Sequence, residues 1–126
     1  MKGDTGIGAA QLSQKEVKEM SNRLFQGIVH QMKDAVNRVI GVIDENGTII
    51  ACSDLTRVGG GNDFFPIELG DSHEVFIRDG YTYKPFGIHV KPDYAVFVEG
   101  TDEPAGKYAS VIATVSYTHL RAHETS

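Results

Sequence analysis

The stretch that most constrains this chain is residues 38–60, RVIGVIDENGTIIACSDLTRVGG, because it carries a strong turn signal between two apolar runs. The turn contains Asn46-Gly47, and an Asn-Gly pair tolerates the positive φ angles of a tight hairpin. The flanking runs are mostly β-branched and too apolar for strands with one face in water. We therefore expect a β-hairpin whose strands are covered on both faces by helices from either side in sequence.

A long amphipathic helix is predicted over residues 13–37, before the hairpin. Ser13 and Glu16 have the spacing of a capping box, and apolar residues recur at three- and four-residue steps from Val17 to Val36. About 24 helical residues span roughly 36 Å, which is long for a small domain. We expect part of the helix to project beyond the core and to pair with its copy in a homodimer. The alternative is a helix packed wholly on its own sheet.

The second half of the chain carries strand signals and one further helix. Strands are predicted over residues 73–78, 81–88 and 94–99. The aromatic segment 64–67 is expected to pack on the sheet, and a helix is predicted from Ala105 to about Val115 with Asp102 as a cap. This order predicts an α+β fold: a five-stranded antiparallel sheet with a long N-terminal helix and a C-terminal helix.

Composition and charge exclude several classes of protein. The 126 residues are 40% hydrophobic with a net charge of −5, which argues against disorder and against nucleic-acid binding by this piece. Cys52 is the only cysteine, so no intramolecular disulfide can form. No apolar run approaches the roughly 20 residues that span a bilayer, and the N-terminus lacks a signal-peptide core. We therefore expect a cytoplasmic protein without membrane contact.

The predicted domain boundaries are a flexible N-terminus at residues 1–12, one folded domain at 13–115 and a separate tail at 116–126. The end of the chain, VSYTHLRAHETS, resembles a translated sequencing-adapter string that recurs in assembled genomes. The resemblance implies that this tail is not native and that the natural protein continues differently after about Thr114.

Two stretches resemble the sugar diacid recognition domain, a PAS-like sensor. Residues 44–59, DENGTIIACSDLTRVG, resemble its Asp-x-x-Gly and Asp-x-x-Arg pattern. Residues 99–115, EGTDEPAGKYASVIATV, resemble its closing helix, with Glu103-Pro104 and Lys107-Tyr108 at the matching positions. That domain is the N-terminal part of carbohydrate diacid regulators, bacterial transcription factors whose C-terminal part carries a PucR-type helix-turn-helix.

The resemblance covers about residues 20–115 and implies a PAS-like sensor of a transcriptional regulator, truncated before its helix-turn-helix. It implies a small acidic ligand, homodimerisation, and DNA contact only through a C-terminal domain that lies outside this chain. Residues 81–100, YTYKPFGIHVKPDYAVFVEG, depart from the diacid-binding version. The ligand therefore stays open between a sugar diacid and another small organic acid.

Arg57 is the principal candidate for ligand binding. A guanidinium can hold a carboxylate through two parallel hydrogen bonds. The equal alternative is a structural pair with Asp54, which lies three residues earlier. Ser53 and Asp54 could present a hydroxyl and a charge to a ligand, but capping of a short helical turn is favoured for both.

A second group of candidates comes from one strand and its exit: Tyr81, Tyr83, Lys84, Phe86 and His89. Tyr83 and Phe86 are expected as walls of a ligand pocket, and Lys84 and His89 as positive charges for an acidic ligand. Plain core packing is the favoured alternative for the aromatic residues, and a loop role is favoured for His89.

The sequence predicts no enzyme. Cys52 with His30, His73 or His89 is a formal pairing of a nucleophile with a base, but no cysteine-centred motif supports it. The sequence also predicts no metal ligands and no cofactor. Two other functions stay open: a haem- or flavin-binding PAS sensor with His73 or His89 as axial ligand, and a dimerisation module without a ligand.

Overall fold

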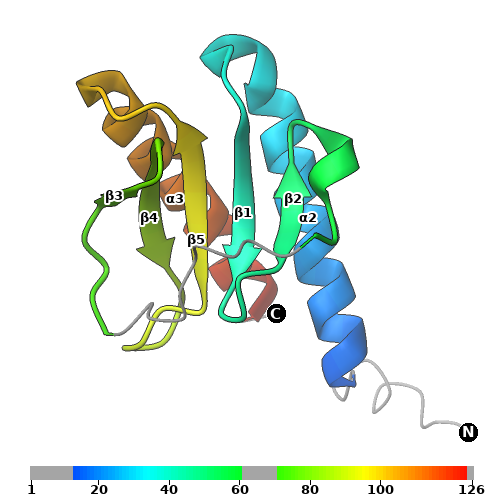
Figure 1. Ribbon diagram of the computed structural model, residues 1–126. Coiled ribbons are helices and arrows are strands. Elements are labelled where there is room, and N and C mark those ends of the chain that lie inside the picture. The colour runs from blue at the N-terminus through cyan, green and yellow to red at the C-terminus, as the bar shows by residue number, and fades with distance from the viewer. Residues whose placement is uncertain (1–12, 61–70, 125–126) are drawn as a thin grey trace, which may run out of the picture.

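A computed structural model describes residues 13–60 and 71–124 of this chain. The elements are α2 (Gln14–Val36), β1 (Ile40–Asp44), β2 (Ile49–Cys52), the short 3-10 turn η1 (Leu55–Arg57), β3 (Phe76–Arg78), β4 (Tyr81–Phe86), β5 (Tyr94–Glu99) and α3 (Glu103–Glu124) (Figure 1). The predicted α+β fold is confirmed: a five-stranded antiparallel sheet with an N-terminal and a C-terminal helix. The aromatic segment 64–67 and the predicted flexible N-terminus lie outside the described residues.

The strands are ordered β2-β1-β5-β4-β3 in the sheet. The two hairpins therefore meet at the central β1–β5 pair, where Ile40 lies opposite Val98. In β4, Pro85 pairs with Ala95 of β5. β3 ends its pairing at Tyr83, so Pro85 lies on a stretch of β4 that β3 does not cover. A proline has no N–H to donate, so it fits a position where one side of the strand is unpaired.

The N-terminal helix begins and ends where its sequence signals predict. The Ser13 hydroxyl accepts from the Glu16 amide at 3.1 Å, and the Glu16 carboxylate accepts from the Ser13 amide at 2.9 Å, which completes the capping box. Asn37 ends the helix in the left-handed conformation, with φ 57°. Residues 15–20 are exposed, and this end of α2 extends past the sheet in Figure 1. The expected projection of the helix is therefore present in the single chain.

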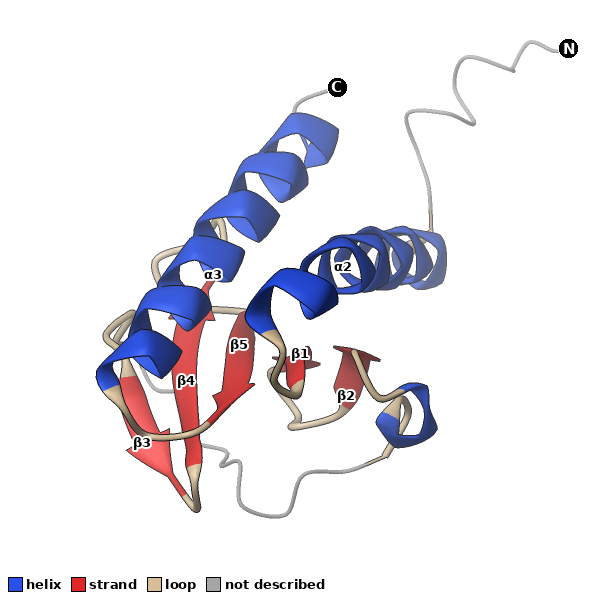
Figure 2. Cartoon of the chain, turned by 90° about the horizontal axis from the view of Figure 1, so that it is seen from above, coloured by secondary structure: helices blue, strands red, loops and turns tan. Residues whose placement is uncertain are grey.

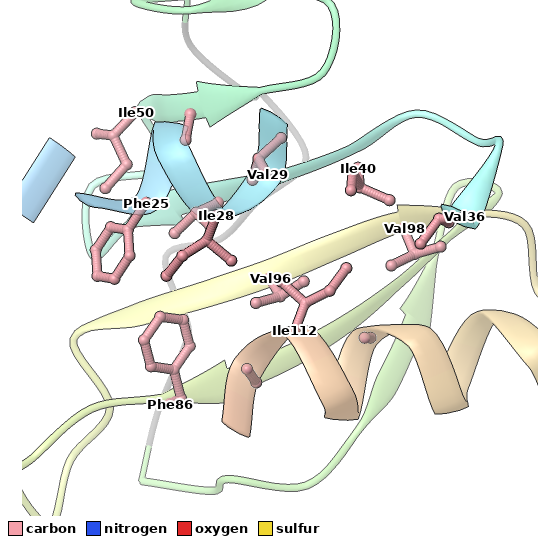
Figure 3. Packing of buried hydrophobic residues seen from close by; sticks show 14 of the residues in the cluster. Phe25, Ile28, Val29, Val36, Ile40, Ile50, Phe86, Val96, Val98 and Ile112 are labelled. Carbon is pink, nitrogen blue, oxygen red and sulfur yellow. The ribbon is translucent and has the colours of Figure 1, made fainter. Parts of the chain in front are cut away.

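Both helices lie on one face of the sheet (Figure 2). α2 packs on β1 and β2, α3 packs on β4 and β5, and the two helices contact each other. Side chains from both helices and from the sheet form one buried core. Figure 3 shows Phe25, Val29, Ile40, Val96 and Ile112 in it. The alternation of side chains along each strand sends the remaining apolar residues to the other face.

The face opposite the helices, called here the second face, also has a buried apolar cluster. It consists of Ile43, Ile49, Cys52, Tyr83, Ala95 and Phe97. Every residue of β1 and β2 is buried, as expected for strands covered on both faces. The expectation that helices cover both faces is wrong, because α2 and α3 lie on the same face of the sheet (Figure 2). Gly41 belongs to this arrangement, because a Cβ atom there would collide with the Phe97 ring and the Ala51 carbonyl.

The hairpin turn differs in detail from its prediction. Gly47 has a φ of 83°, but Asn46 is not in the positive-φ region. The Gly47 amide donates to the Asp44 carbonyl, and the Asp44 carboxylate accepts from the amides of Asn46 and Thr48. The result is an ordinary turn followed by a left-handed glycine, with a register shift between Val42 and Ile43. Asp44 supplies this turn with a carboxylate acceptor.

The second half contains shorter strands and a longer helix than predicted. β3 begins at Phe76 instead of residue 73, and β4 ends at Phe86 instead of residue 88. α3 continues to Glu124 instead of ending near Val115. Ser116 and Leu120 belong to this extension and are buried. The helix therefore runs through the expected junction with the tail. Among the described residues, neither helix is apolar over a length that would cross a membrane.

Candidate functional site

Arg57 lies in η1, the turn that follows β2 and that Asp54 caps as predicted. One Asp54 carboxylate oxygen accepts from the Thr56 amide at 3.1 Å and from the Thr56 hydroxyl at 2.6 Å. These two hydrogen bonds are the main cause of a lowered pKa of the Asp54 carboxylate. The short turn is thus held by its own side chains, and it presents Arg57 at the edge of the sheet.

The Arg57 guanidinium joins two distant parts of the sheet. Its Nε lies 3.4 Å from Asp54 Oδ2, and its Nη1 donates to the Tyr81 hydroxyl at 3.0 Å. Tyr81 begins β4 and packs against the second-face cluster, so the contact crosses from the β2 side of the sheet to β4. The Tyr81 hydroxyl is the main cause of a raised pKa of Arg57. The Asp54 pair that was one of two alternatives is present, and the Arg57 side chain remains 42% exposed.

Ser53 has a different role from the cap that was predicted. Its hydroxyl accepts from the Ile40 amide at 3.1 Å, and its own amide donates to the Ile40 carbonyl at 2.8 Å. Ser53 therefore continues the β1–β2 pairing beyond the end of β2. Asp54 alone caps η1, because the Ser53 side chain is turned to β1.

The strand candidates divide between the two faces of the sheet. Tyr83 is 1% exposed on the second face and stacks on Phe76 with ring centroids 5.0 Å apart. Phe86 lies on the helix face and packs edge-on against Phe25 at 5.6 Å. The two aromatic residues cannot wall one pocket as expected, because an odd number of positions separates them on a pleated strand. Both are core residues.

Lys84 and His89 also lie apart from Arg57. Lys84 belongs to the helix face, and its ammonium donates to the backbone carbonyl of His73. His89 follows β4, where its Nδ1 lies 2.9 Å from Asp93 Oδ2. The predicted site residues therefore form no single pocket. Asp54 and Arg57 come together, and Tyr81, from the second group of candidates, joins them.

Two connections were missed by the sequence reasoning. Gln26 of α2 pairs with the backbone of Cys52 through both its amide nitrogen and oxygen, at 3.2 and 3.1 Å. The Tyr81–Arg57 bond spans 24 positions in the chain. The aromatic pattern of β4 was the one signal for Tyr81, and no local pattern marks Gln26.

Burial also raises the pKa of the Cys52 thiol, which disfavours a thiolate nucleophile.

In the part of the chain that the structure describes, no three His, Cys, Asp or Glu side chains gather in a way that could hold a metal ion. Comparison with protein-family models gave no match, and neither the curated proteins nor the solved structures include one that matches this chain.

Proposed function

We propose that this domain is a cytoplasmic sensor that binds a small organic acid at Arg57, and that it forms the N-terminal part of a transcriptional regulator. The observation that carries the proposal is the half-exposed Arg57 guanidinium, anchored to Tyr81 at one end of the sheet. DNA contact belongs to a C-terminal domain outside this chain. The resemblance of residues 44–59 to a sugar diacid recognition domain supports the same choice.

The chemistry of Arg57 and Tyr81 suits a carboxylate. The Tyr81 hydroxyl accepts from Arg57, so its own proton remains for donation to an incoming oxygen. The Nε–Asp54 distance of 3.4 Å is longer than a good charge-assisted hydrogen bond. A ligand carboxylate that engages the guanidinium through two short bonds would therefore replace a weak internal pair by a stronger one.

The same contacts offer a route from the ligand to the helices. Arg57 follows β2, whose last residue, Cys52, is held by Gln26 of α2. Tyr81 begins β4, on which α3 packs. In this mechanism, a displacement of η1 on binding moves both helices relative to the sheet. The output to a DNA-binding domain then follows from the shift of α3, the element nearest to the continuation of the chain.

A thermal-shift screen over D-glucarate, succinate and other small acids tests the proposal. At least one acid should raise Tm, and Arg57→Ala should abolish the rise. Arg57→Lys should retain only part of it, because an ammonium cannot form the paired bonds. Arg23→Ala, which removes an exposed arginine on α2, is the matched control and should respond like the wild type. A broad panel that contains no stabilising acid would reject the acid-sensor proposal.

A dimerisation module is the second candidate, and the surface of α2 favours it. Val17 and Met20 are 37% and 40% exposed, and the half-buried Leu24 continues their stripe at the three- and four-residue spacing of a helix–helix seam. Light scattering should give a dimer, and Met20→Glu should give a monomer. Arg23→Glu introduces the same charge at another exposed position of α2 and should leave the dimer intact. A monomer at high protein concentration would reject pairing through α2.

The absorption spectrum of the purified protein tests the remaining alternative, a haem- or flavin-binding sensor. A haem or flavin absorbs in the visible range, and a sensor for a colourless acid does not.

A further inference from the structure

A groove lies between the end of β4 and the middle of α3, on the helix face of the sheet. It has a volume of about 320 Å³, and Phe86, Ala113 and Tyr117 give it apolar walls. Figure 2 shows α3 lying over β4 on this side. The volume is at the lower end of the range for small-molecule sites. The groove is on the face opposite the Arg57–Tyr81 contact, so it is a separate place in the molecule.

The polar group at this groove is the Lys84 ammonium. Lys84 is half-buried, and its Nζ donates one hydrogen bond to the His73 carbonyl. A lysine ammonium has three donors, and a carbonyl is a neutral partner. Within residues 13–60 and 71–124, no carboxylate forms an ion pair with Lys84. A partly desolvated cation whose partner among these residues is neutral attracts an anion.

The ammonium is also held in position. The imidazole Nε2 of His73 lies 2.7 Å from the Val90 carbonyl, which fixes the segment that carries the carbonyl acceptor of Lys84. On the α3 side, the Thr114 hydroxyl donates to the Ser110 carbonyl at 2.9 Å. Its oxygen can therefore accept a hydrogen bond from a ligand hydroxyl or amide. The groove thus offers a cation, an acceptor and apolar walls in one small space.

We infer that this groove is a second ligand site, which takes a small carboxylate with an apolar body and a hydroxyl group. The carboxylate lies on Lys84, the apolar body contacts Phe86 and Ala113, and the hydroxyl donates to Thr114. The site is independent of the function proposed for Arg57, because the two places share no residue.

NMR titration with mandelate tests the site, since this acid combines a carboxylate, a hydroxyl and a phenyl ring. The amides of Gly87 and Thr114 should shift and saturate in the millimolar range, as expected for a shallow site. Lys84→Met keeps the aliphatic stem without the charge and should weaken binding about tenfold or more. Lys84→Arg keeps the charge and should bind within a fewfold of the wild type. Neutral mandelamide should bind as weakly as mandelate does to Lys84→Met.

The control and the contrary outcomes are distinct from those of the acid-sensor proposal. Arg57→Ala should leave the mandelate shifts at Gly87 and Thr114 unchanged. Equal affinity in the wild type and Lys84→Met, or equal affinity for mandelate and mandelamide, would overturn the inference. So would mandelate shifts that are confined to the surroundings of Arg57. If Lys84→Met does not fold, the comparison of mandelate with mandelamide on the wild type still decides.

Discussion

At the scale of single residues, Arg38 joins the first half of the chain to the second. Its Nη1 and Nη2 hold the Asp102 carboxylate at 2.6 and 2.7 Å, and Nη1 also donates to the Glu99 carbonyl at 3.1 Å. The guanidinium lies over the Tyr108 ring. Gly100, with a φ of 111°, leaves the room that the arginine fills. The predicted cap Asp102 is thus chiefly the partner of Arg38.

The Arg38–Asp102 pair predicts a pH-dependent stability. Arg38 is the main cause of an Asp102 pKa lowered from 3.8 to about 2. Because the folded-state pKa is depressed, the pair stabilises the fold above pH 3.8, and this contribution is lost as the pH falls towards about 2. Asp102→Asn should therefore lower Tm near neutral pH, and the difference from the wild type should close in that acidic window. A Tm difference that persists unchanged in acid would contradict the role of the carboxylate.

Glu103→Gln is the matched control for this measurement. It removes one negative charge at the next position. In the described part of the chain, the Arg38 guanidinium donates to Glu99 and Asp102 and not to Glu103. Its Tm near neutral pH should stay closer to the wild type than that of Asp102→Asn.

At the scale of elements, strand β1 requires its glycine, whereas helix α2 only tolerates one. Gly41 lies in β1 beneath the Phe97 ring, where the close approach of the ring requires the absence of a side chain. Gly27 lies in α2 with open space where its Cβ would stand. The central strand therefore depends on its glycine for packing. The helix has no such need within the single chain, and it carries a residue with poor helix propensity.

The two glycines predict alanine substitutions of opposite sign. Gly41→Ala should reduce the free energy of unfolding by about 1–3 kcal/mol or more, because the added methyl meets a ring and a backbone carbonyl. Gly27→Ala should increase it by about 0.5–1 kcal/mol through helix propensity alone. Urea denaturation measures both. Loss of stability in Gly27→Ala would mean that a close contact forms at this position in solution, as in a helix-paired dimer.

At the scale of the whole molecule, the sheet order places segments from the two ends of the chain in one core. β1 and β5 are adjacent at the centre of the sheet, and α2 and α3 cover the same face beside each other. Leu120 belongs to this core with 4% of its surface exposed, although it lies in the predicted tail. The end of α3 therefore packs as part of the domain.

Leu120→Ala tests whether the last turns of α3 contribute to the folded core. Deletion of a buried leucine side chain should cost about 2–5 kcal/mol, which is a large part of the stability of a small domain. Thr118→Ala is the control on the exposed side of the same helix and should change stability by less than about 0.5 kcal/mol. Chemical denaturation measures both variants. Equal effects would show that this end of α3 does not pack in solution.

The sequence by itself determined most of the local structure. The Ser13 capping box, the apolar period of α2, the turn before Gly47 and the three later strand segments each act within a few residues, so local chemistry was sufficient to place them. Propensity did not locate the end of α3, because the buried Leu120 extends the helix beyond the predicted limit.

Only the tertiary structure decided which of the site residues meet. Strand order brings Tyr81 to Arg57, while the alternation along β4 sends Tyr83 to one face and Lys84 and Phe86 to the other. These contacts depend on pairings between strands far apart in the chain, and no spacing in the sequence encodes them. The stretch that defines the hairpin also supplies Arg57, but its partners and its exposure are properties of the assembled sheet.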